Sequence, residues 1–314
     1  MTTTHDAPTT RRGRLASTAR PRRGHRGLGR YAFLLPAAVF VALFSLYPLA
    51  KLAWMSLSDV TSATLNQEWD FTGLANYIEG FTSGATTEAL WRTLVFVVVV
   101  TAVGMVGGLA AAIALRTAGR WSEIVLAVMV FVWALPPVVN GSVWKFLLAD
   151  DGLANILART LGLTDGSFPF LYDPSWALWS VAFVNSWAVI PFNALVFRAA
   201  LLGISPSIFE AAALDGASRW QEVRHIMIPA ARPTALVLLV LTIVFGFRSF
   251  DYIYVMTYGG PGSATTTLPF LGYLQAFDHY NFGLGSATSV LTVVFVLVLA
   301  IIYARSIRRE EAES

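Results

Sequence analysis

The chain has 314 residues, of which 56% are hydrophobic and only 13% are charged. Soluble globular domains carry about 25% charged residues, so this composition indicates a membrane protein. There is no cysteine, which excludes disulfides, thiolate metal sites and a cysteine nucleophile. The net charge is +3, but 8 of the 22 basic residues lie in the first 30 positions. That distribution suits the inner face of a membrane and does not favour nucleic-acid binding.

The first segment is a basic tail. Residues 1–29 are rich in Thr, Arg and Gly and have almost no large apolar side chains. Such a segment cannot bury enough surface to fold, so we expect a disordered cytoplasmic tail that is attracted to the membrane surface. The apolar run that follows is too long for an ordinary signal peptide, and no small-residue cleavage site comes after it. We therefore expect the tail to remain attached.

Six apolar runs follow the tail. A helix of about 20 apolar residues crosses the hydrocarbon core of a bilayer, so each run is a candidate membrane-spanning helix. The fifth run is interrupted by Arg248. Prolines 36, 136, 137 and 191 fall inside the runs and are expected to bend the helices. The predicted protein is all-α, with six spans at Tyr31–Ala50, Thr93–Leu115, Ile124–Trp144, Pro174–Phe197, Pro233–Met256 and His279–Ala304.

The charges between the spans predict their orientation. The tail, the second and fourth connections and the C-terminus hold 17 of the 22 Lys and Arg residues, whereas segments 57–91, 149–173 and 258–278 are acidic. The positive-inside rule places both termini in the cytoplasm. Lys51 and Lys145 lie near the outer helix ends, where they are expected to reach the headgroups. We predict a transmembrane domain over 30–305 and a cytoplasmic C-terminal tail over 306–314.

The chain lacks residues for chemistry of its own. A P-loop needs a lysine after a glycine, and Lys51 and Lys145, the only lysines, do not follow one. The four histidines are scattered without metal-ligand spacing. We expect no catalytic residue, no metal and no cofactor on this chain. Arg248 and Asp251 are the ionisable residues inside a span, and their i, i+3 spacing places them on one helix face. They either neutralise each other or couple transport to an ion.

The connection between the fourth and fifth spans is a polar insert of about 30 residues, which is far more than a turn requires. Ser205 and Pro206 predict a helix start. Small residues at 211–213 and 216–218 permit another protein to approach closely. Trp220, Val223, Ile226 and Met227 then recur at helical spacing, and Pro229 and Pro233 are expected to end the segment. Two interpretations remain: an amphipathic helix on the membrane surface, or a docking element for another protein.

The stretch "EAAALDGASRWQEVRHIMIP" resembles the signature loop of ATP-binding-cassette (ABC) importer permeases, with Ile228 in place of the usual leucine. The resemblance implies that segment 205–230 couples the permease to a cytoplasmic ATPase. Three further stretches are similar to the carbohydrate-uptake branch and its larger maltose-type subunit: "FTGLANY", "NSWAVIPFN" and "TYGGPGSATTTLPFLGYLQAF". The six predicted spans do not include counterparts of the extra N-terminal helices and external domain of the enterobacterial maltose subunit, so we expect none of the contacts made by that domain. The residues implied to contact the ATPase are Glu210, Ala211, Ala212, Asp215, Gly216 and Trp220.

The resemblance also implies an assembly. A type I importer permease of the cytoplasmic (inner) membrane would pair with a second, homologous permease as a heterodimer. Two ATP-binding subunits would carry ATP and Mg²⁺, and an extracytoplasmic sugar-binding protein would deliver a sugar or a sugar-like solute such as glycerol 3-phosphate. Lipid would surround the spans, and no nucleic acid would take part. The alternatives are an autonomous secondary carrier or channel, which would use Arg248 and Asp251, and a membrane receptor or scaffold.

A substrate path for sugars needs aromatic faces and neutral hydrogen-bonding groups. Such residues gather in the fourth span around Pro191 and at the end of the fifth, and the positions similar to those of the maltose-type subunit lie among them. The alternative for each is a residue that only packs helices together. The predicted path comprises Asn185, Trp187, Ala188, Val189, Phe192, Asn193, Thr242, Phe245, Gly246, Arg248, Ser249 and Asp251.

Overall fold

The computed structural model describes Thr2 and residues 34–117 and 119–313, with the side chains of the last helix described to Ile301 and at Arg305. Nearly all of the predicted basic tail, residues 1–29, lies outside this range. The chain divides into two units, Met1–Ala50 and Lys51–Ser314. Each unit is described by itself.

The first spanning helix runs from Leu35 to Ser56 and crosses the boundary between the two units. Its parts are α2 (Leu35–Val41), a π-helical turn η1 (Ala42–Leu46) and α3 (Tyr47–Ser56). Pro36 lies in the first turn of α2, so it begins a helix instead of bending one, because its missing N–H is not needed there. The helix also passes Lys51, beyond the predicted end at Ala50.

The segment after this helix is a small external cap in unit 2. Strands β1 (Ser58–Asp59) and β2 (Asp70–Phe71) pair antiparallel, and α4 (Ala75–Thr82) follows. Asn76 is buried, and its side-chain amide donates hydrogen bonds of 3.0 Å to the carbonyls of Ser56 and Ser58. The "FTGLANY" stretch therefore has a structural role, because Asn76 ties α4 to the end of the first spanning helix.

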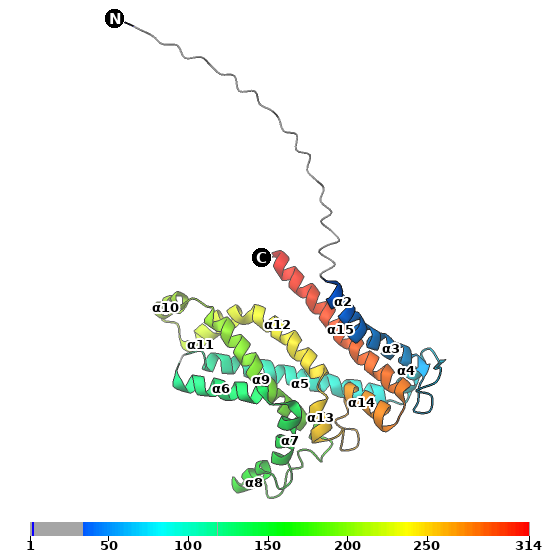
Figure 1. Ribbon diagram of the computed structural model, residues 1–314. Helices are drawn as coiled ribbons and strands as arrows, with labels where there is room; N and C mark the ends of the chain where they lie inside the picture. Colours follow the sequence, from blue (N-terminus) through cyan, green and yellow to red (C-terminus); the bar gives the residue numbers. More distant parts are fainter. Residues whose placement is uncertain (1, 3–33, 118, 314) are drawn as a thin grey trace. The chain divides into compact units, whose positions relative to one another are not determined.

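Four long helices run through unit 2 (Figure 1). Helix α5 packs along α9, and α12 contacts both of them. Glycines permit this close packing, since a Cβ at Gly108 would come within 2.5 Å of the Cβ of Asn193. Helix α5 starts before the predicted Thr93, and Glu88 and Arg92 form an i, i+4 ion pair of 2.7 Å in its first turns. The four helices are α5 (Ala85–Ala114), α9 (Ala177–Leu202), α12 (Ile228–Phe247) and α15 (Phe282–Glu313).

The third predicted span is broken into α6 (Arg120–Ala134) and α7 (Pro137–Leu147), which meet at an angle of 103°. Leu135 precedes a proline and is extended, with ψ of 133°, as steric contact with the proline ring requires. The bend predicted from the two adjacent prolines is thus confirmed. In contrast, α9 continues without a break through Pro191. The described residues hold five spanning helices, or six when α6 and α7 are taken as one span.

Two prolines do not end the cytoplasmic segment as predicted. Residues Arg219–Phe247 form one continuous helical stretch, made of α11 (Arg219–Glu222), the π-helical turn η2 (Val223–Met227) and α12. The amide of Ile228 donates to the carbonyl of Val223, which is a π-type bond, and Pro229 follows at once. The same arrangement precedes Pro48 after η1. A wide turn moves the preceding carbonyls away from the proline ring, so the helix tolerates it.

The fifth span ends earlier than predicted, at Phe247. A new helix, α13 (Asp251–Met256), starts after a short break and packs against α7. Lys145 of α7 donates a 2.9 Å hydrogen bond to the carbonyl of Val255. The Lys145 ammonium thus satisfies a carbonyl at the C-terminal end of α13, where carbonyls lack helical partners, and that it also reaches the headgroups stays a prediction.

The "TYGGPGSATTT" stretch forms a compact loop before α14 (Leu268–Tyr273) and the π-helical turn η3 (Leu274–Asp278). Gly259 has a φ of +82°, and a Cβ there would lie 2.8 Å from the Phe270 ring, so only glycine fits. The hydroxyl of Tyr258 donates to the carboxylate of Asp278, and this hydrogen bond raises the pKa of Tyr258 to about 12. The motif is thus explained by packing of the loop.

Candidate functional site

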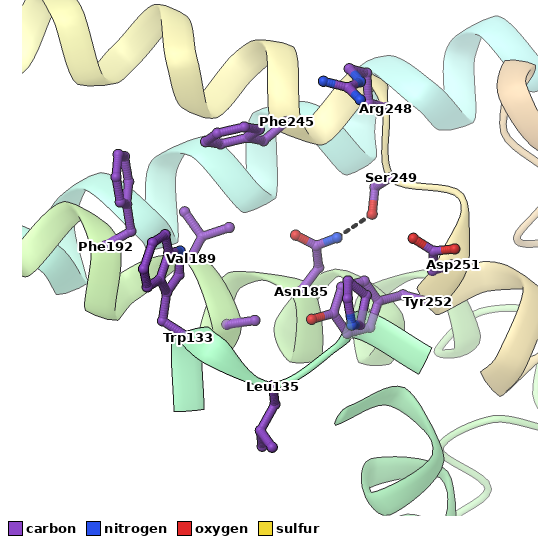
Figure 2. A pocket seen from close by; sticks show the side chains of 12 residues that line it. Trp133, Leu135, Asn185, Val189, Phe192, Phe245, Arg248, Ser249, Asp251 and Tyr252 are labelled. Atoms are coloured by element: carbon purple, nitrogen blue, oxygen red, sulfur yellow. Dashed lines mark hydrogen bonds between the residues drawn. The ribbon is translucent and has the colours of Figure 1, made fainter. Parts of the chain in front are cut away.

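A cavity of about 340 Å³ lies where the two broken helices face α9 (Figure 2). One wall comes from the break between α6 and α7, and another from the break between α12 and α13. The cavity is lined by Trp133, Leu135, Pro137, Asn185, Ala188, Val189, Phe192, Phe245, Arg248, Ser249, Asp251 and Tyr252. Helix breaks at membrane depth leave backbone groups without helical partners, which is tolerated where they face protein or a water-filled space.

One side of the cavity is aromatic. The rings of Trp133 and Phe192 stack with centroids 5.7 Å apart, and Phe245 meets Phe192 edge to face at 6.1 Å. Ala188 and Val189 complete this side. The stacked pair presents flat apolar surface to a solute, and flat rings complement the C–H faces of sugars.

The opposite side of the cavity is polar. Asn185 of α9 donates a hydrogen bond to the hydroxyl of Ser249, which connects α9 to the α12–α13 break (Figure 2). Asp251 is the first residue of α13, where the helix dipole favours a carboxylate. Tyr252 accepts a 3.3 Å hydrogen bond from Asn140 of α7. The polar groups thus come from α9 and from the α12–α13 region, and Asn140 of α7 holds Tyr252 in place.

Arg248 and Asp251 do not neutralise each other as one predicted alternative required. The helix stops at Phe247, so the two residues no longer share a helix face, and their side chains do not point toward one another in Figure 2. Among the described residues, the only ion pair within 4.0 Å joins Arg92 and Glu88. Arg248 and Asp251 therefore both remain available at the cavity.

Four residues of the predicted path lie outside the cavity. The side chains of Asn193 and Thr242 are buried and hydrogen-bonded to each other at 3.3 Å. Gly246 packs against Val97 of α5, where a Cβ would come within 3.2 Å of a methyl group. Trp187 meets Trp144 edge to face at 6.1 Å. For Asn193, Thr242 and Gly246 the structure favours the alternative that these residues pack helices together.

Four lining residues were missed from the sequence: Trp133, Leu135, Pro137 and Tyr252. A signal was present for the first three, because Pro136 and Pro137 predict a break and the residues beside a break face whatever fills it. Tyr252 had no such signal. Its place follows from the early end of α12, which the apolar sequence through Met256 does not reveal.

The cytoplasmic insert begins with α10 (Pro206–Leu214), and its surface is largely free of contact with the described part of the chain. Glu210, Ala211 and Asp215 are exposed. Leu214 is 90% exposed and Trp220 is 68% exposed. Large apolar side chains of this kind at a surface indicate an interaction site for membrane or protein.

Gly216 ends α10 for a backbone reason. Its φ is +74°, and the amides of Gly216 and Ala217 donate to the carbonyls of Ala213 and Ala212 at 3.1 and 2.9 Å. This is the Schellman arrangement, which favours glycine because other residues are strained there. A Cβ at Gly216 would meet nothing within 4 Å in this chain. The prediction attributed this glycine to close approach of a partner, and the structure supplies its conformation as a second reason.

The next helix start has a complete capping box. The Ser218 hydroxyl accepts from the amide of Gln221, and the Gln221 side chain accepts from the amide of Ser218. This arrangement satisfies two of the free amides at the start of α11. The turn from Gly216 to Ser218 is therefore defined by its sequence on both sides.

Helix α10 is connected to the membrane helices through Phe209. The guanidinium of Arg116 lies 3.7 Å from the centre of the Phe209 ring. Phe209 also packs against a buried cluster formed by α5, α9 and α12, which includes Phe197, Leu201 and Leu238. Arg198 of α9 donates a 2.8 Å hydrogen bond to the carbonyl of Leu115 at the end of α5. A displacement of α10 would therefore be passed to three membrane helices. The sequence had not singled out Phe209 or Arg116.

Comparison with known proteins places these features in one family. Residues 104–311, more than half of the chain, match the family described as "Binding-protein-dependent transport system inner membrane component". The chain is 31% identical over 279 residues to the trehalose/maltose transport system permease protein MalF of Thermococcus litoralis, covering 88% of this chain and 92% of that protein. It is 32% identical over 302 residues to the diacetylchitobiose uptake system permease protein DasB of Streptomyces coelicolor, covering 91% and 88%.

Another relative is the sn-glycerol-3-phosphate transport system permease protein UgpA of Yersinia pestis, 30% identical over 281 residues, with 89% of this chain and 94% of that protein covered. Among solved structures, a chain of a bacterial ABC transporter involved in the import of the acidic polysaccharide alginate superposes with a TM-score of 0.76 at 23% identity. That match covers 90% of this chain and 96% of the other. At this identity the likeness shows the fold, which is that of an ABC importer permease.

Proposed function

This chain belongs to the family of binding-protein-dependent transport system inner membrane components, and from that membership we propose that it imports a sugar or a sugar-like solute by a cycle driven on partner subunits. The chain is a multi-pass membrane protein and a transport subunit. The solute is inferred from two sources, namely the substrates named for its relatives and the cavity in the membrane.

The cavity is the observation that carries the choice of solute. Its aromatic side offers the stacked rings of Trp133 and Phe192, and its polar side offers Asn185, Ser249 and Asp251. Sugar rings have apolar C–H faces and several hydroxyls, so they need both kinds of surface at once. Arg248 adds a cation at the rim, which would serve a phosphate or carboxylate substituent.

Helix α10 and the residues up to Trp220 would contact an ATP-binding subunit. The exposed Leu214 and Trp220 and the cap at Gly216 give this segment a defined apolar surface. ATP and Mg²⁺ would bind to two such subunits, and their closure would push on α10. Phe209 would pass the motion to α5, α9 and α12, which changes the walls of the cavity. In this scheme the chain itself hydrolyses nothing.

The remaining partners complete the cycle. A second, homologous permease would face this chain across the path, and an extracytoplasmic binding protein would deliver the solute from outside. A structural neighbour of this chain is a bacterial alginate ABC transporter in complex with an alginate pentasaccharide-bound periplasmic protein. The proposed heterodimer and the two ATP-binding subunits follow the resemblance of segment 205–230 to the signature loop.

Reconstitution tests this proposal. The chain, purified with its co-expressed partner subunits and placed in proteoliposomes with the binding protein, should take up a labelled sugar only when ATP is supplied on the cytoplasmic side. The chain alone should show no uptake. ATP-independent uptake by the chain alone would overturn the proposal and would support the second candidate, an autonomous carrier. That candidate has one observation in its favour, since Arg248 and Asp251 both line the cavity without pairing.

A further inference from the structure

Helix α8 (Leu153–Thr160) has its polarity reversed relative to a helix on the surface of a soluble protein. Four large apolar side chains at spacings of three and four residues share one face, and they are between 45% and 71% exposed. They are Leu153, Ile156, Leu157 and Leu161. A polar residue, Asn155, lies on the opposite face and is fully buried. The apolar face therefore points away from the protein.

Asn155 fixes this orientation. Its amide nitrogen donates hydrogen bonds of 3.1 Å to the carbonyls of Ala149 and Phe168, and its carbonyl oxygen accepts a 2.8 Å bond from the amide of Phe168. Rotation of α8 to bury its leucines would leave these groups without partners inside the protein, which is costly for buried polar atoms. The exposed apolar face is thus built into the fold.

The buried face of α8 is connected to the start of α9 through Phe168, whose backbone is bonded to Asn155. The ring of Phe168 meets Trp176 edge to face at 5.1 Å. Trp176, Trp179 and Phe183 follow one face of α9 and are about half exposed. An apolar groove of about 320 Å³ lies beside them and is lined by Leu148, Phe168, Phe170, Trp176, Trp179, Ser180 and Phe183.

The residues near α8 indicate what covers its exposed apolar face. Tryptophans at the end of a spanning helix mark the level of the membrane–water interface, and Trp176 and Trp179 occupy that position on α9. Asn155 is bonded to Phe168, and the Phe168 ring contacts Trp176, so α8 is held near the same interface. Leu and Ile make up the face, and leucine is under-represented among the residues that dominate protein–protein contacts. These features fit acyl chains better than a protein surface.

We propose that α8 lies in the interfacial plane of the membrane, with Leu153, Ile156, Leu157 and Leu161 among the lipid acyl chains and the aromatic groove holding one chain. By the charge distribution between the spans, this is the outer leaflet. Arg159 is exposed on the adjacent edge of α8, where it can reach a lipid phosphate. The anchor fixes the depth of α7, which contributes Pro137 to the cavity.

Because the chain has no cysteine, a single introduced cysteine reports on one position only. Nitroxide labels would be attached to Leu157→Cys, to Asp165→Cys in the exposed acidic loop and to Val98→Cys on an exposed face of α5. Each full chain would be studied with its co-purified subunits in nanodiscs of phosphatidylethanolamine and phosphatidylglycerol. Power-saturation EPR would then compare the accessibility of each label to oxygen, which enriches in lipid, and to a water-soluble nickel chelate.

The label at Leu157 should be several-fold more accessible to oxygen than to the nickel chelate, with a ratio between those at Asp165 and Val98. A ratio at Leu157 equal to that at Asp165 would overturn the proposal, because the face would then lie in water. Protection of Leu157 from both reagents would also overturn it, since that pattern indicates a covering protein. Neither outcome depends on the identity of the transported solute.

Discussion

The substitution Gly216→Ala is expected to weaken the proposed contact between α10 and an ATP-binding subunit without unfolding the membrane domain. Gly216 has a φ of +74° and forms the end of α10. A residue with a Cβ is strained in this left-handed region by about 1–2 kcal/mol. A Cβ here meets nothing within 4 Å, so no collision within this chain adds to the strain.

The strain can be converted into an expected effect on docking. If the docked state requires the cap and the undocked segment can relax, the substitution disfavours the docked state by the full strain. A difference of about 1–2 kcal/mol corresponds to a factor of about 5–30 in an equilibrium constant. The apparent affinity for the ATP-binding subunit should fall by that factor.

The assay is ATP hydrolysis by the reconstituted complex, stimulated by binding protein and solute, as a function of the concentration of ATP-binding subunit. Gly84→Ala is the matched control, because Gly84 has a φ of +78° and also meets nothing within 4 Å, but lies between α4 and α5. Both variants should lose similar thermal stability, and only Gly216→Ala should need more ATP-binding subunit. If both variants need the same concentration of ATP-binding subunit, the glycine at position 216 does not support docking.

Three further outcomes are expected. Arg116→Ala removes the cation above Phe209, an interaction worth about 0.5–2 kcal/mol, so stimulated ATP hydrolysis should fall several-fold. The control Arg120→Ala, at the start of α6, should leave hydrolysis unchanged, and an equal loss in both variants would contradict the link through Phe209. Thr242→Val leaves the buried Asn193 amide without its partner, so the unfolding free energy should drop by about 1–3 kcal/mol. The double variant Thr242→Val/Asn193→Leu should lose less than the sum of the two single variants, and strict additivity would argue against a hydrogen bond between these residues. Phe192→Ala removes the central ring of the aromatic side of the cavity, so the KM for uptake should rise by up to about tenfold. The control Phe131→Ala, on an exposed face of α6, should not change the KM, and an unchanged KM in Phe192→Ala would show that the aromatic side does not contact the solute.

The sequence predicted the spanning helices well because apolar length is a local property. It could not place the end of α12, since apolar and aromatic residues resume after Arg248 and continue to Met256 with only Asp251 charged, and only the tertiary packing of α13 on α7 marks the new helix. Pro229 misled for a related reason. A proline usually closes a helix, but the π-helical turn η2 accommodates it, and nothing in the local sequence announces that turn.

The residues of the candidate site could likewise be predicted only in part from local sequence. Asn185, Phe192 and Ser249 were recognised by residue type, and the structure brings them to one cavity. Asn193 and Thr242 have the same chemistry but satisfy each other inside the helix packing. Residue type alone cannot separate a polar group that faces a cavity from one that pairs with a neighbouring helix, because that depends on the rotation of each helix about its axis. Phe209 was missed because its partner, Arg116, lies in another connection.

The proposed contact between α10 and the subunit that hydrolyses ATP can be tested by a cross-link. A single cysteine at Ala211, exposed on α10, would carry a benzophenone label in the otherwise cysteine-free chain, with Asp165→Cys in the external loop as the control. On illumination of the active complex, the label at position 211 should form an adduct with an ATP-binding subunit, and the label at 165 should not. A label at 211 that reacts with lipid alone, in a complex that still hydrolyses ATP, would show that α10 does not contact an ATP-binding subunit.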